Sequence, residues 1–288
     1  MDAQERLSRL ASYIDRMPSL PPTVTKVLEI CNDRATSPVD LNRVISLDPV
    51  LMARVLKLIN SAYYGLPNKV VSMVRAIIML GINTVKNLAL STAVMDTLNR
   101  KTDLGVLNPV GFWRHSLAVG VTTRLLAKMH GEELSTIDEY FVAGLLHDIG
   151  KIPMDRVLAK EYVEVIEYCR EREVPLHVAE REFLGFDHAD CGRLIVDTWR
   201  LPTTILDTVT YHHRPAEYRG ANSAFVYAVH TANYFVNASG IGESGDNYPA
   251  ALDESAREGL GVDQTKLSEL ANLVDGEVQK AENFLKVV

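Results

Sequence analysis

Apolar residues recur at spacings of three and four along almost the whole chain, and no stretch alternates apolar and polar residues for long. That period is the signature of amphipathic helices rather than strands, so we predict an all-α fold. The expected helices cover about residues 3–16, 22–31, 37–45, 48–59, 72–80, 83–98, 109–130, 135–147, 155–172, 176–184, 188–199, 202–213 and 222–237, and one that starts at 263.

Short polar side chains mark where several of these helices begin. Ser37 and Asp48 each precede a proline, which suits the first turn of a helix. Asn83 is expected to cap the next helix, and Ser135 with Asp138 has the spacing of a capping box. These signals divide the pattern into many short helices joined by short turns.

Two segments lack the helical period. Residues 99–105 are polar and end in a glycine, and residues 239–256 are rich in Gly, Asp and Glu and read as a surface loop. We place a domain boundary at the first of them. The chain is then expected to form an N-terminal helical subdomain, 1–104, packed on a larger helical bundle, 105–288.

Composition narrows the class of protein. The 288 residues are 47% apolar and 23% charged, and the net charge of −7 argues against a surface built to bind nucleic acid. No apolar run is long enough for a membrane span, and Met1-Asp2 opens no leader, so we expect a cytoplasmic protein. The scattered cysteines Cys31, Cys169 and Cys191 are expected to be buried free thiols.

The segment 141–151 carries the strongest chemical signal. An apolar run ends in His147-Asp148, and Gly150 then breaks the chain before Lys151. A carboxylate at the end of a buried helix is costly unless a cation lies against it. Imidazole and carboxylate side chains together are common ligands of transition metals. The sequence therefore indicates a metal site at Asp148.

Four further histidines lie on or beside apolar faces, and each has an ordinary structural reading. His115 is inward on its helix and could be a hydrogen-bonded core residue. His188 begins a helix at which Asp187 could simply be the cap. The adjacent pair His212-His213 could be a solvated pair at a helix end. No single histidine decides between these readings and metal binding.

Taken in order, the motifs resemble a known superfamily. The series His115, His147-Asp148, Lys151, His188 and His212-His213 looks like the HD metal-dependent phosphohydrolases and their relatives, the HD-GYP cyclic-dinucleotide phosphodiesterases. The N-terminal half resembles more specifically the HDOD domain, a signalling-output variant of the HD fold. The resemblance covers about residues 13–236, and its N-terminal motifs are Leu20-Pro21-Pro22, Asp48-Pro49, Asn60-Ser61-Ala62-Tyr63-Tyr64-Gly65 and Ala76-Ile77-Ile78-Met79-Leu80-Gly81.

The resemblance implies a role for each of these side chains. One metal would be held by His115, His147 and Asp148, and Asp148 would bridge to a second held by His188, His212 and His213. Lys151 would contact a substrate phosphate, which makes Asp148 and Lys151 the candidate catalytic residues. A cation that interacts with a helix C-terminus is an equally good reading of Lys151.

The last ligand of the superfamily is an aspartate in an Ala-Asp pair. Here the matching pair is Ala232-Asn233, so Asn233 is the expected last ligand and brings no charge. His230, three residues earlier, could replace it, although a core or capping role is the simpler reading. A site rich in histidine with one carboxylate favours iron or manganese, and then zinc, as one or two divalent ions.

The resemblance also bears on activity. HD-GYP enzymes have a glutamate and a Gly-Tyr-Pro loop after the histidine pair, and here the segment is Arg214-Pro215-Ala216-Glu217-Tyr218-Arg219-Gly220. HDOD proteins commonly lack the full catalytic set and act by binding. We therefore expect a bacterial regulator that responds to a protein partner or a small phosphorylated ligand.

Two alternatives remain open. The first is an active phosphohydrolase that cleaves a nucleotide or a cyclic dinucleotide. The second, which the acidic composition disfavours, is a nucleic-acid-binding regulator that uses the N-terminal helices. The segment 60–65 could contact a partner or the bundle, or could be buried turn structure.

Overall fold

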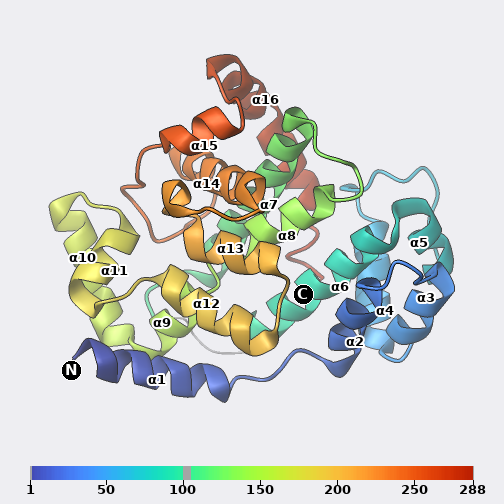
Figure 1. Ribbon diagram of the computed structural model, residues 1–288, viewed down its shortest axis with the longest axis horizontal. Coiled ribbons are helices and arrows are strands. Elements are labelled where there is room, and N and C mark those ends of the chain that lie inside the picture. The colour runs from blue at the N-terminus through green and yellow to red at the C-terminus, as the bar shows by residue number, and fades with distance from the viewer. Residues whose placement is uncertain (1, 100–104, 288) are drawn as a thin grey trace.

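The structure is a computed structural model that describes residues 2–99 and 105–287, and within these ranges every regular element is helical. The predicted all-α class is confirmed. The first part of the chain contains α1 (Ala3–Asp15), α2 (Pro22–Cys31), α3 (Pro38–Ile45), α4 (Pro49–Ile59), α5 (Met73–Leu80) and α6 (Ile82–Asn99) (Figure 1).

The second part is the larger one and carries all the candidate ligands. It contains α7 (Pro109–His130), α8 (Ile137–Leu146), α9 (Lys151–Val157), α10 (Ala159–Arg172), α11 (Leu176–Leu184), α12 (His188–Trp199), α13 (Thr203–Tyr211), the 3-10 turn η1 (Pro215–Glu217), α14 (Ser223–Ala238), α15 (Glu254–Gly259) and α16 (Gln264–Ala281).

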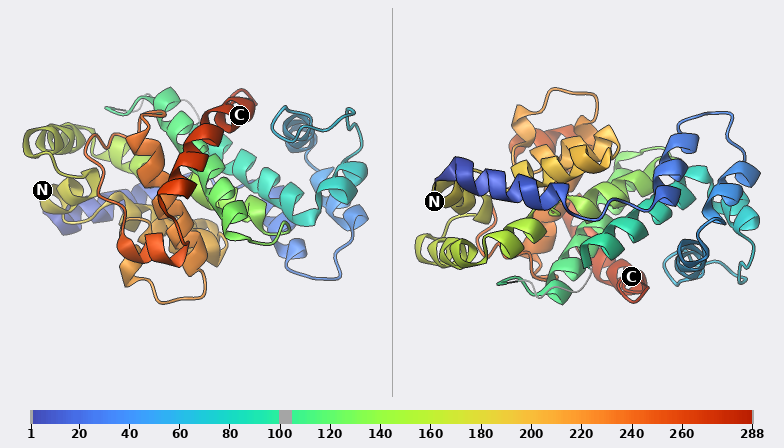
Figure 2. Two further views of the ribbon diagram at one scale, coloured as in Figure 1. Left: turned by 90° about the horizontal axis from the view of Figure 1, so that it is seen from above. Right: turned by 90° about the horizontal axis from the view of Figure 1, so that it is seen from below.

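Helices α2–α5 form one end of the molecule, and α6 runs from them into the centre to pack on α8 (Figures 1 and 2). α1 lies apart from them and packs against α9 and α12 at the other end, where Arg9 donates to the carbonyl of Val157. The proposed boundary falls in residues 100–104, outside the described ranges, so the division into 1–104 and 105–288 stays a prediction.

Helices α7 and α8 form the centre of the bundle, and glycines bring them close together. A Cβ atom added at Gly144 would lie 2.8 Å from the Cα of Gly120 and 2.6 Å from the hydroxyl of Thr123. Only glycines fit so close a helix crossing. The crossing places the helix that carries His115 against the helix that ends at His147.

The Asn60–Gly65 turn contacts the bundle through Tyr63, which is buried, while Ala62 and Gly65 are exposed. The ring of Tyr63 lies 5.8 Å from that of Phe141 on α8 and 6.0 Å from that of Phe284. The guanidinium of Arg124 lies 4.8 Å above the Tyr63 ring. Of the readings left open by the sequence, contact with the bundle is confirmed for Tyr63, and the turn as a whole is only partly buried.

Two expectations about helix ends were wrong. α8 starts without a side-chain cap, because Asp138 instead accepts a hydrogen bond from Thr84 at 2.6 Å and pairs with Arg124 at 3.2 Å. Asn83 does not cap α6, which begins one residue earlier, and its amide donates to the carbonyl of Ser135. Tertiary partners have taken over both polar groups.

Two segments are more divided than the hydrophobic pattern suggested. The helix expected over 155–172 is broken at Leu158, between α9 and α10. The loop expected over 239–256 ends in the short helix α15, which Asp253 caps. By contrast, the caps at Ser37 and Asp48 form as predicted.

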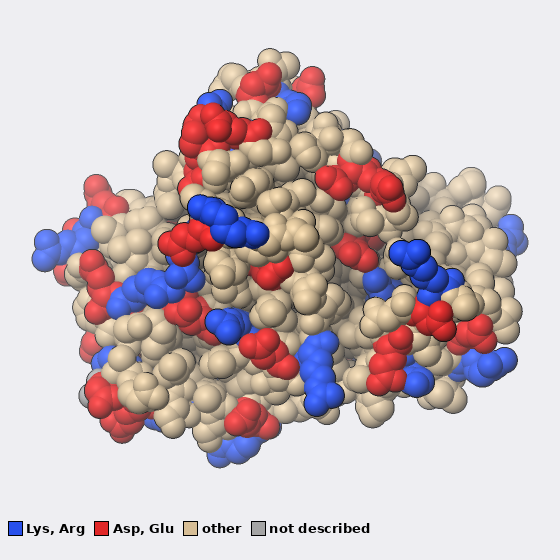
Figure 3. All heavy atoms as spheres, viewed as in Figure 1, with Lys and Arg blue, Asp and Glu red and all other residues tan. Residues whose placement is uncertain are grey.

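In the described part of the chain, the charged surface and the cysteine thiols indicate no further functional site. On the face in Figure 3, basic and acidic side chains are interspersed. The three cysteines are free; Cys169 and Cys191 are buried and Cys31 is half-buried. Among the described residues, no single helix has both the length and the apolar character to cross a bilayer, although α5 and α6, bent by 116°, pass that criterion as a pair.

Candidate metal centre

The turn between α8 and α9 carries His147 and Asp148 into the middle of the bundle. Both side chains have no solvent exposure. The N-terminus of α12 lies directly against this turn, because a Cβ atom at Gly150 would overlap the carbonyl of His188. Gly150 is therefore required for the close approach that brings His188 to Asp148.

The structure brings the predicted ligands together in two groups that share Asp148. In each group the donor atoms lie within 4.8 Å of one another. The first group is His115, His147 and Asp148, and the second is Asp148, His188, His212 and His213. Asn233 lies beside the first group, with its Oδ1 3.1 Å from the Nε2 of His115.

The two carboxylate oxygens of Asp148 face different groups. Oδ2 lies 3.2 Å from the Nε2 of His147 and 3.9 Å from that of His115. Oδ1 lies 3.2 Å from the Nε2 of His188 and 3.6 Å from that of His212. This is the arrangement of a carboxylate that can bridge two cations.

Backbone carbonyls orient the imidazoles. The Nδ1 of His147 lies 2.8 Å from the carbonyl oxygen of Gly144, and the Nδ1 of His212 lies 3.0 Å from that of Val209. A carbonyl can only accept, so each Nδ1 carries the proton and each Nε2 presents a lone pair to the centre. Such outer contacts are typical of metal-ligating histidines.

A buried glutamate orients His188 in the same way. One carboxylate oxygen of Glu180 lies 2.6 Å from the Nδ1 of His188 and also accepts its backbone N–H at 2.9 Å. The other accepts the hydroxyl of Tyr162 at 2.7 Å. Glu180 is not among the residues predicted from the sequence. The signal was present, since Glu180 lies on one helical face with Leu176 and Leu184, where a lone charge needs a partner.

Among the described residues, two fully buried polar atoms of the centre make no well-directed hydrogen bond. They are the Nε2 of His147 and the Oδ1 of Asp148. The Nε2 atoms of His188 and His213 approach to 2.9 Å. Unpaired buried acceptors are costly, and a cation among them would satisfy several at once. The residues present therefore fit a divalent transition metal.

The protonation states favour metal binding by most of these groups. Burial lowers the pKa of His115 to about 3 and that of His212 to about 4, so both are neutral at pH 7. Burial opposes ionisation of Asp148, but His147 and Lys151 outweigh it and hold the pKa of Asp148 well below its ordinary value. Burial also opposes protonation of His188, but Glu180 overrides it and raises the pKa of His188 to about 10.

Lys151 is the first residue of α9 and is 2% exposed. Its Nζ donates to Asp148 at 2.6 Å and to the carbonyl of Ser244 at 3.0 Å. Lys151 therefore lies beside the centre, as a phosphate-binding group would. Its ammonium group is already bound by Asp148 and by the carbonyl of Ser244. It is not at a helix C-terminus, so the reading of a cation on a helix dipole was wrong.

The two other nearby histidines lie outside both groups. The Nδ1 of His230 lies 2.7 Å from the carbonyl oxygen of His212, and its Nε2 accepts the backbone N–H of Asp253 at 2.9 Å. With both ring nitrogens engaged, His230 is the structural histidine of the simpler reading. His177, which the sequence analysis did not single out, stacks on His213 with ring centroids 4.0 Å apart.

Comparison with known families matches residues 17–215 to the HDOD domain. The chain belongs to the HDOD family. The resemblance inferred from the N-terminal motifs is thereby confirmed.

Similar proteins place the chain in the same fold. An uncharacterised protein of Treponema pallidum (strain Nichols) is 26% identical over 81% of this chain, which spans only 46% of that protein's length. An HDOD domain protein of unknown function from Geobacter sulfurreducens is 24% identical, with 98% of this chain and 99% of that one covered and a TM-score of 0.79. A Shewanella amazonensis SB2B protein, whose name assigns it provisionally to the phosphohydrolases, is 23% identical, with coverage of 96% and 98% and a TM-score of 0.71.

Proposed function

We propose that this HDOD protein is a regulator whose bundle holds a divalent transition-metal centre, with Asp148 shared between two ion positions. The observation that carries this proposal is the division of the two Asp148 oxygens between separate groups of imidazoles. A carboxylate that served only as the partner of Lys151 would not need several imidazole nitrogens around it.

The two positions would use different donors. His115 and His147 would hold the first ion with Asp148 and the amide oxygen of Asn233. His188, His212 and His213 would hold the second with the other Asp148 oxygen. A bound divalent ion supplies Lewis acidity and positive charge at this place. The mixed imidazole and oxygen donors favour iron or manganese, and then zinc.

The enclosure of the centre supports a regulatory role over catalysis. The cavity that touches His213 and Asn233 from outside has a volume of only about 10 Å³. That is room for about one water molecule and not for a phosphodiester. A cytoplasmic signalling protein that senses a partner or a small phosphorylated ligand through this bundle is the role that we assign.

Metal-dependent thermal stabilisation tests this proposal. Manganese, iron(II) and zinc are each added to the metal-stripped protein and to an Asp148→Asn variant. The expected result is a rise in the melting temperature of the wild type that the variant lacks, because ligands that bind only the folded state stabilise it. A His130→Gln variant, altered outside the centre, is the control. If none of the three ions shifts the melting curve of the wild type from that of the metal-stripped protein, the metal centre is refuted.

Lys151 favours a second candidate function, a metal-dependent phosphohydrolase that acts on a nucleotide or cyclic dinucleotide. Its ammonium lies within 2.6 Å of Asp148, where it could offset charge on a phosphoryl group. The name of the Shewanella neighbour is in keeping with this candidate. Turnover of a cyclic dinucleotide by the metal-loaded wild type, lost in Asp148→Asn, would replace the regulatory assignment with this one.

A further inference from the structure

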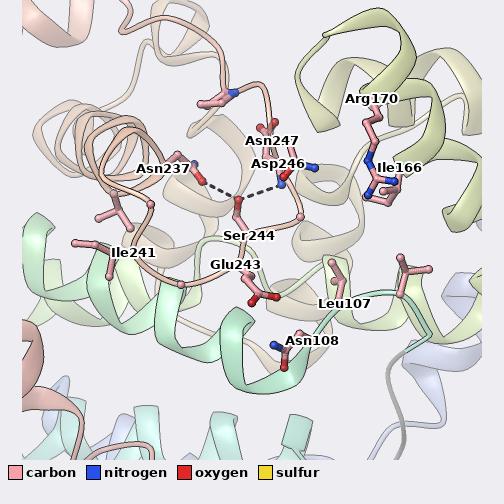
Figure 4. Close-up of a pocket in the computed structure, with 16 residues that line it drawn as sticks. Leu107, Asn108, Ile166, Arg170, Asn237, Ile241, Glu243, Ser244, Asp246 and Asn247 are labelled. Carbon is pink, nitrogen blue, oxygen red and sulfur yellow. Dashed lines mark hydrogen bonds between the residues drawn. The ribbon is translucent and has the colours of Figure 1, made fainter.

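Residues 239–253, which join α14 to α15 and are called the strap below, run over the metal centre. The strap contains neither helix nor strand. Gly240, Gly242 and Gly245 have φ angles of +65°, +77° and +80°, a conformation that strongly favours glycine. The course of the strap across the bundle is therefore set by its glycines (Figure 4).

The middle of the strap lies directly on the ligand-bearing helix α7. A Cβ atom at Gly242 would overlap the backbone nitrogen of His115. The next residue, Glu243, donates its backbone N–H to the carbonyl of Gly111 at 2.9 Å. At this point no side chain separates the strap from the turn of helix that holds His115.

Ser244 connects the strap to Lys151 and to the group of His115, His147 and Asp148. Its carbonyl accepts from the Nζ of Lys151 at 3.0 Å, and its hydroxyl donates to Asn237 at 2.7 Å. The amide of Asn237 donates in turn to Asn233 at 2.8 Å, and Asn233 contacts His115. A series of hydrogen bonds thus runs from the strap to the proposed donors.

The strap separates two very different spaces. On its outer side is a cavity of about 400 Å³, lined by the strap, by residues 106–108 that precede α7, by the end of α14 and by Ile166 and Arg170 of α10 (Figure 4). On its inner side are Lys151 and the centre, where the cavity that touches His213 and Asn233 has a volume of about 10 Å³. The outer cavity is large enough for a small phosphorylated ligand, and the inner cavity is not.

We propose that the strap is a movable partition that controls access to the metal centre and to Lys151. Lifting it would remove the carbonyl of Ser244 from the Nζ of Lys151 and join the outer cavity to the centre. A phosphate group could then take the place of that carbonyl. This inference rests on the proposed metal centre and adds the way in which the centre is gated.

The glycines of the strap supply a matched pair of variants. Both Gly240→Ala and Gly242→Ala place a side chain at positive φ, so both carry the same kind of backbone cost. Only the second adds a clash, because nothing lies within 4 Å of a Cβ atom at Gly240. Gly242→Ala should therefore displace the strap from α7, and it replaces none of the proposed ligand side chains.

The first readout is the rate at which a chelator removes manganese or zinc from the loaded protein. Gly242→Ala should release the ion about tenfold faster than wild type, since opening to solvent limits release. Gly240→Ala should remain within about twofold. The second readout needs no metal: hydrogen exchange in segments 109–118 and 145–152 should rise in Gly242→Ala alone.

These readouts separate the strap from the metal centre. If the wild type binds no metal but hydrogen exchange rises only in Gly242→Ala, the proposal of a metal centre is refuted and the proposal of a movable strap is supported. If the two folded variants release the metal at the same rate and show the same hydrogen exchange, the proposal that the strap controls access is refuted. Should Gly242→Ala not fold, Asp246→Ala takes its place, because Asp246 anchors the strap by accepting the backbone N–H of Leu176 at 3.2 Å.

Binding of inorganic phosphate, followed by phosphorus NMR, tests the second part of the inference. Phosphate should bind about tenfold more tightly to Gly242→Ala than to Gly240→Ala, and the gain should vanish when Lys151→Met is added to Gly242→Ala. Equal phosphate affinity in the two glycine variants, or a gain that survives Lys151→Met, would show that the strap does not mask Lys151.

Discussion

The two halves of the candidate centre share one carboxylate but are built differently. The half around His188, His212 and His213 consists of imidazoles, and Glu180 fixes one of them from behind. The half around His115 and His147 has Asn233 in the place where the superfamily has a charged ligand. If the centre holds two ions, we expect the His188 half to bind its ion more tightly and the Asn233 half to be the weaker position.

The difference also shows how a centre of this kind can change its role. A neutral amide at Asn233 leaves Asp148 as the one carboxylate that contacts both groups within the described residues. Two divalent ions would then have less negative charge around them than a dinuclear hydrolase supplies. An occupied His188 half with a loosely held second ion suits a structural or sensing centre better than a catalytic one.

Loss of Asp148 has the largest expected effect because both halves use it. Asp148→Asn should abolish binding at both positions and should lower the free energy of unfolding by about 3–5 kcal/mol, since Lys151 stays buried without its counter-charge. Elemental analysis and chemical denaturation measure the two effects. Asp155→Asn, a buried carboxylate outside both groups, should keep its metal. Retention of metal by Asp148→Asn would break the bridging account.

Acid should weaken the metal-free protein. The pKa of His115 is about 3 and that of His212 about 4, against about 6.5 in an unfolded chain. As the pH falls below 6.5, these imidazoles take up protons in the unfolded chain but not yet in the folded protein. The free energy of unfolding therefore decreases, by about 1.4 kcal/mol per pH unit for each such imidazole.

Two imidazoles within the His188 half differ in this respect, because the low pKa of His212 contributes to the slope and the high pKa of His188 does not. His188, with a pKa of about 10, is protonated in both states below pH 6.5 and adds no slope there. Denaturation curves of the stripped protein between pH 7 and pH 5 measure the loss. A stability that does not change over this range would show that the imidazoles of the empty centre titrate normally.

Glu180→Gln should weaken the His188 half selectively. The amide carries no negative charge, so its contact with the Nδ1 of His188 is weaker than that of the carboxylate, and loss of such an outer contact typically lowers metal affinity by about 10- to 100-fold. Competition with a chelator measures this loss. The matched control is Glu182→Gln on the same helix, because Glu182 also accepts a tyrosine hydroxyl but is exposed. Equal metal affinities of the two variants would show that Glu180 does not support metal binding.

Asn233→Asp should have the smallest effect. It should make the metal affinities of the two halves more nearly equal. A carboxylate 3.1 Å from the Nε2 of His115 adds charge to the weaker position and should raise its affinity by about tenfold. Metal titration followed by calorimetry would show the second binding step strengthen while the first is unchanged. If the stronger step improves instead, the assignment of the two positions is reversed.

The sequence was sufficient for the fold class and for the histidines that meet at Asp148, because helical period and motif order are local signals. It was not sufficient for Glu180 and His177, whose roles depend on which helices α11 packs against. The failed cap at Asp138 has the same origin: Arg124 and Thr84, distant in sequence, take the carboxylate that local spacing assigned to the helix end. The strap read only as a loop, since nothing in its composition shows what it covers.

Crystals of the protein loaded with manganese, iron or zinc, measured at the absorption edge of each metal, test the central claim most directly. The account predicts an anomalous peak among Asp148, His188, His212 and His213, and a weaker peak beside His115 and His147. Absence of any peak among these side chains for all three metals would contradict it.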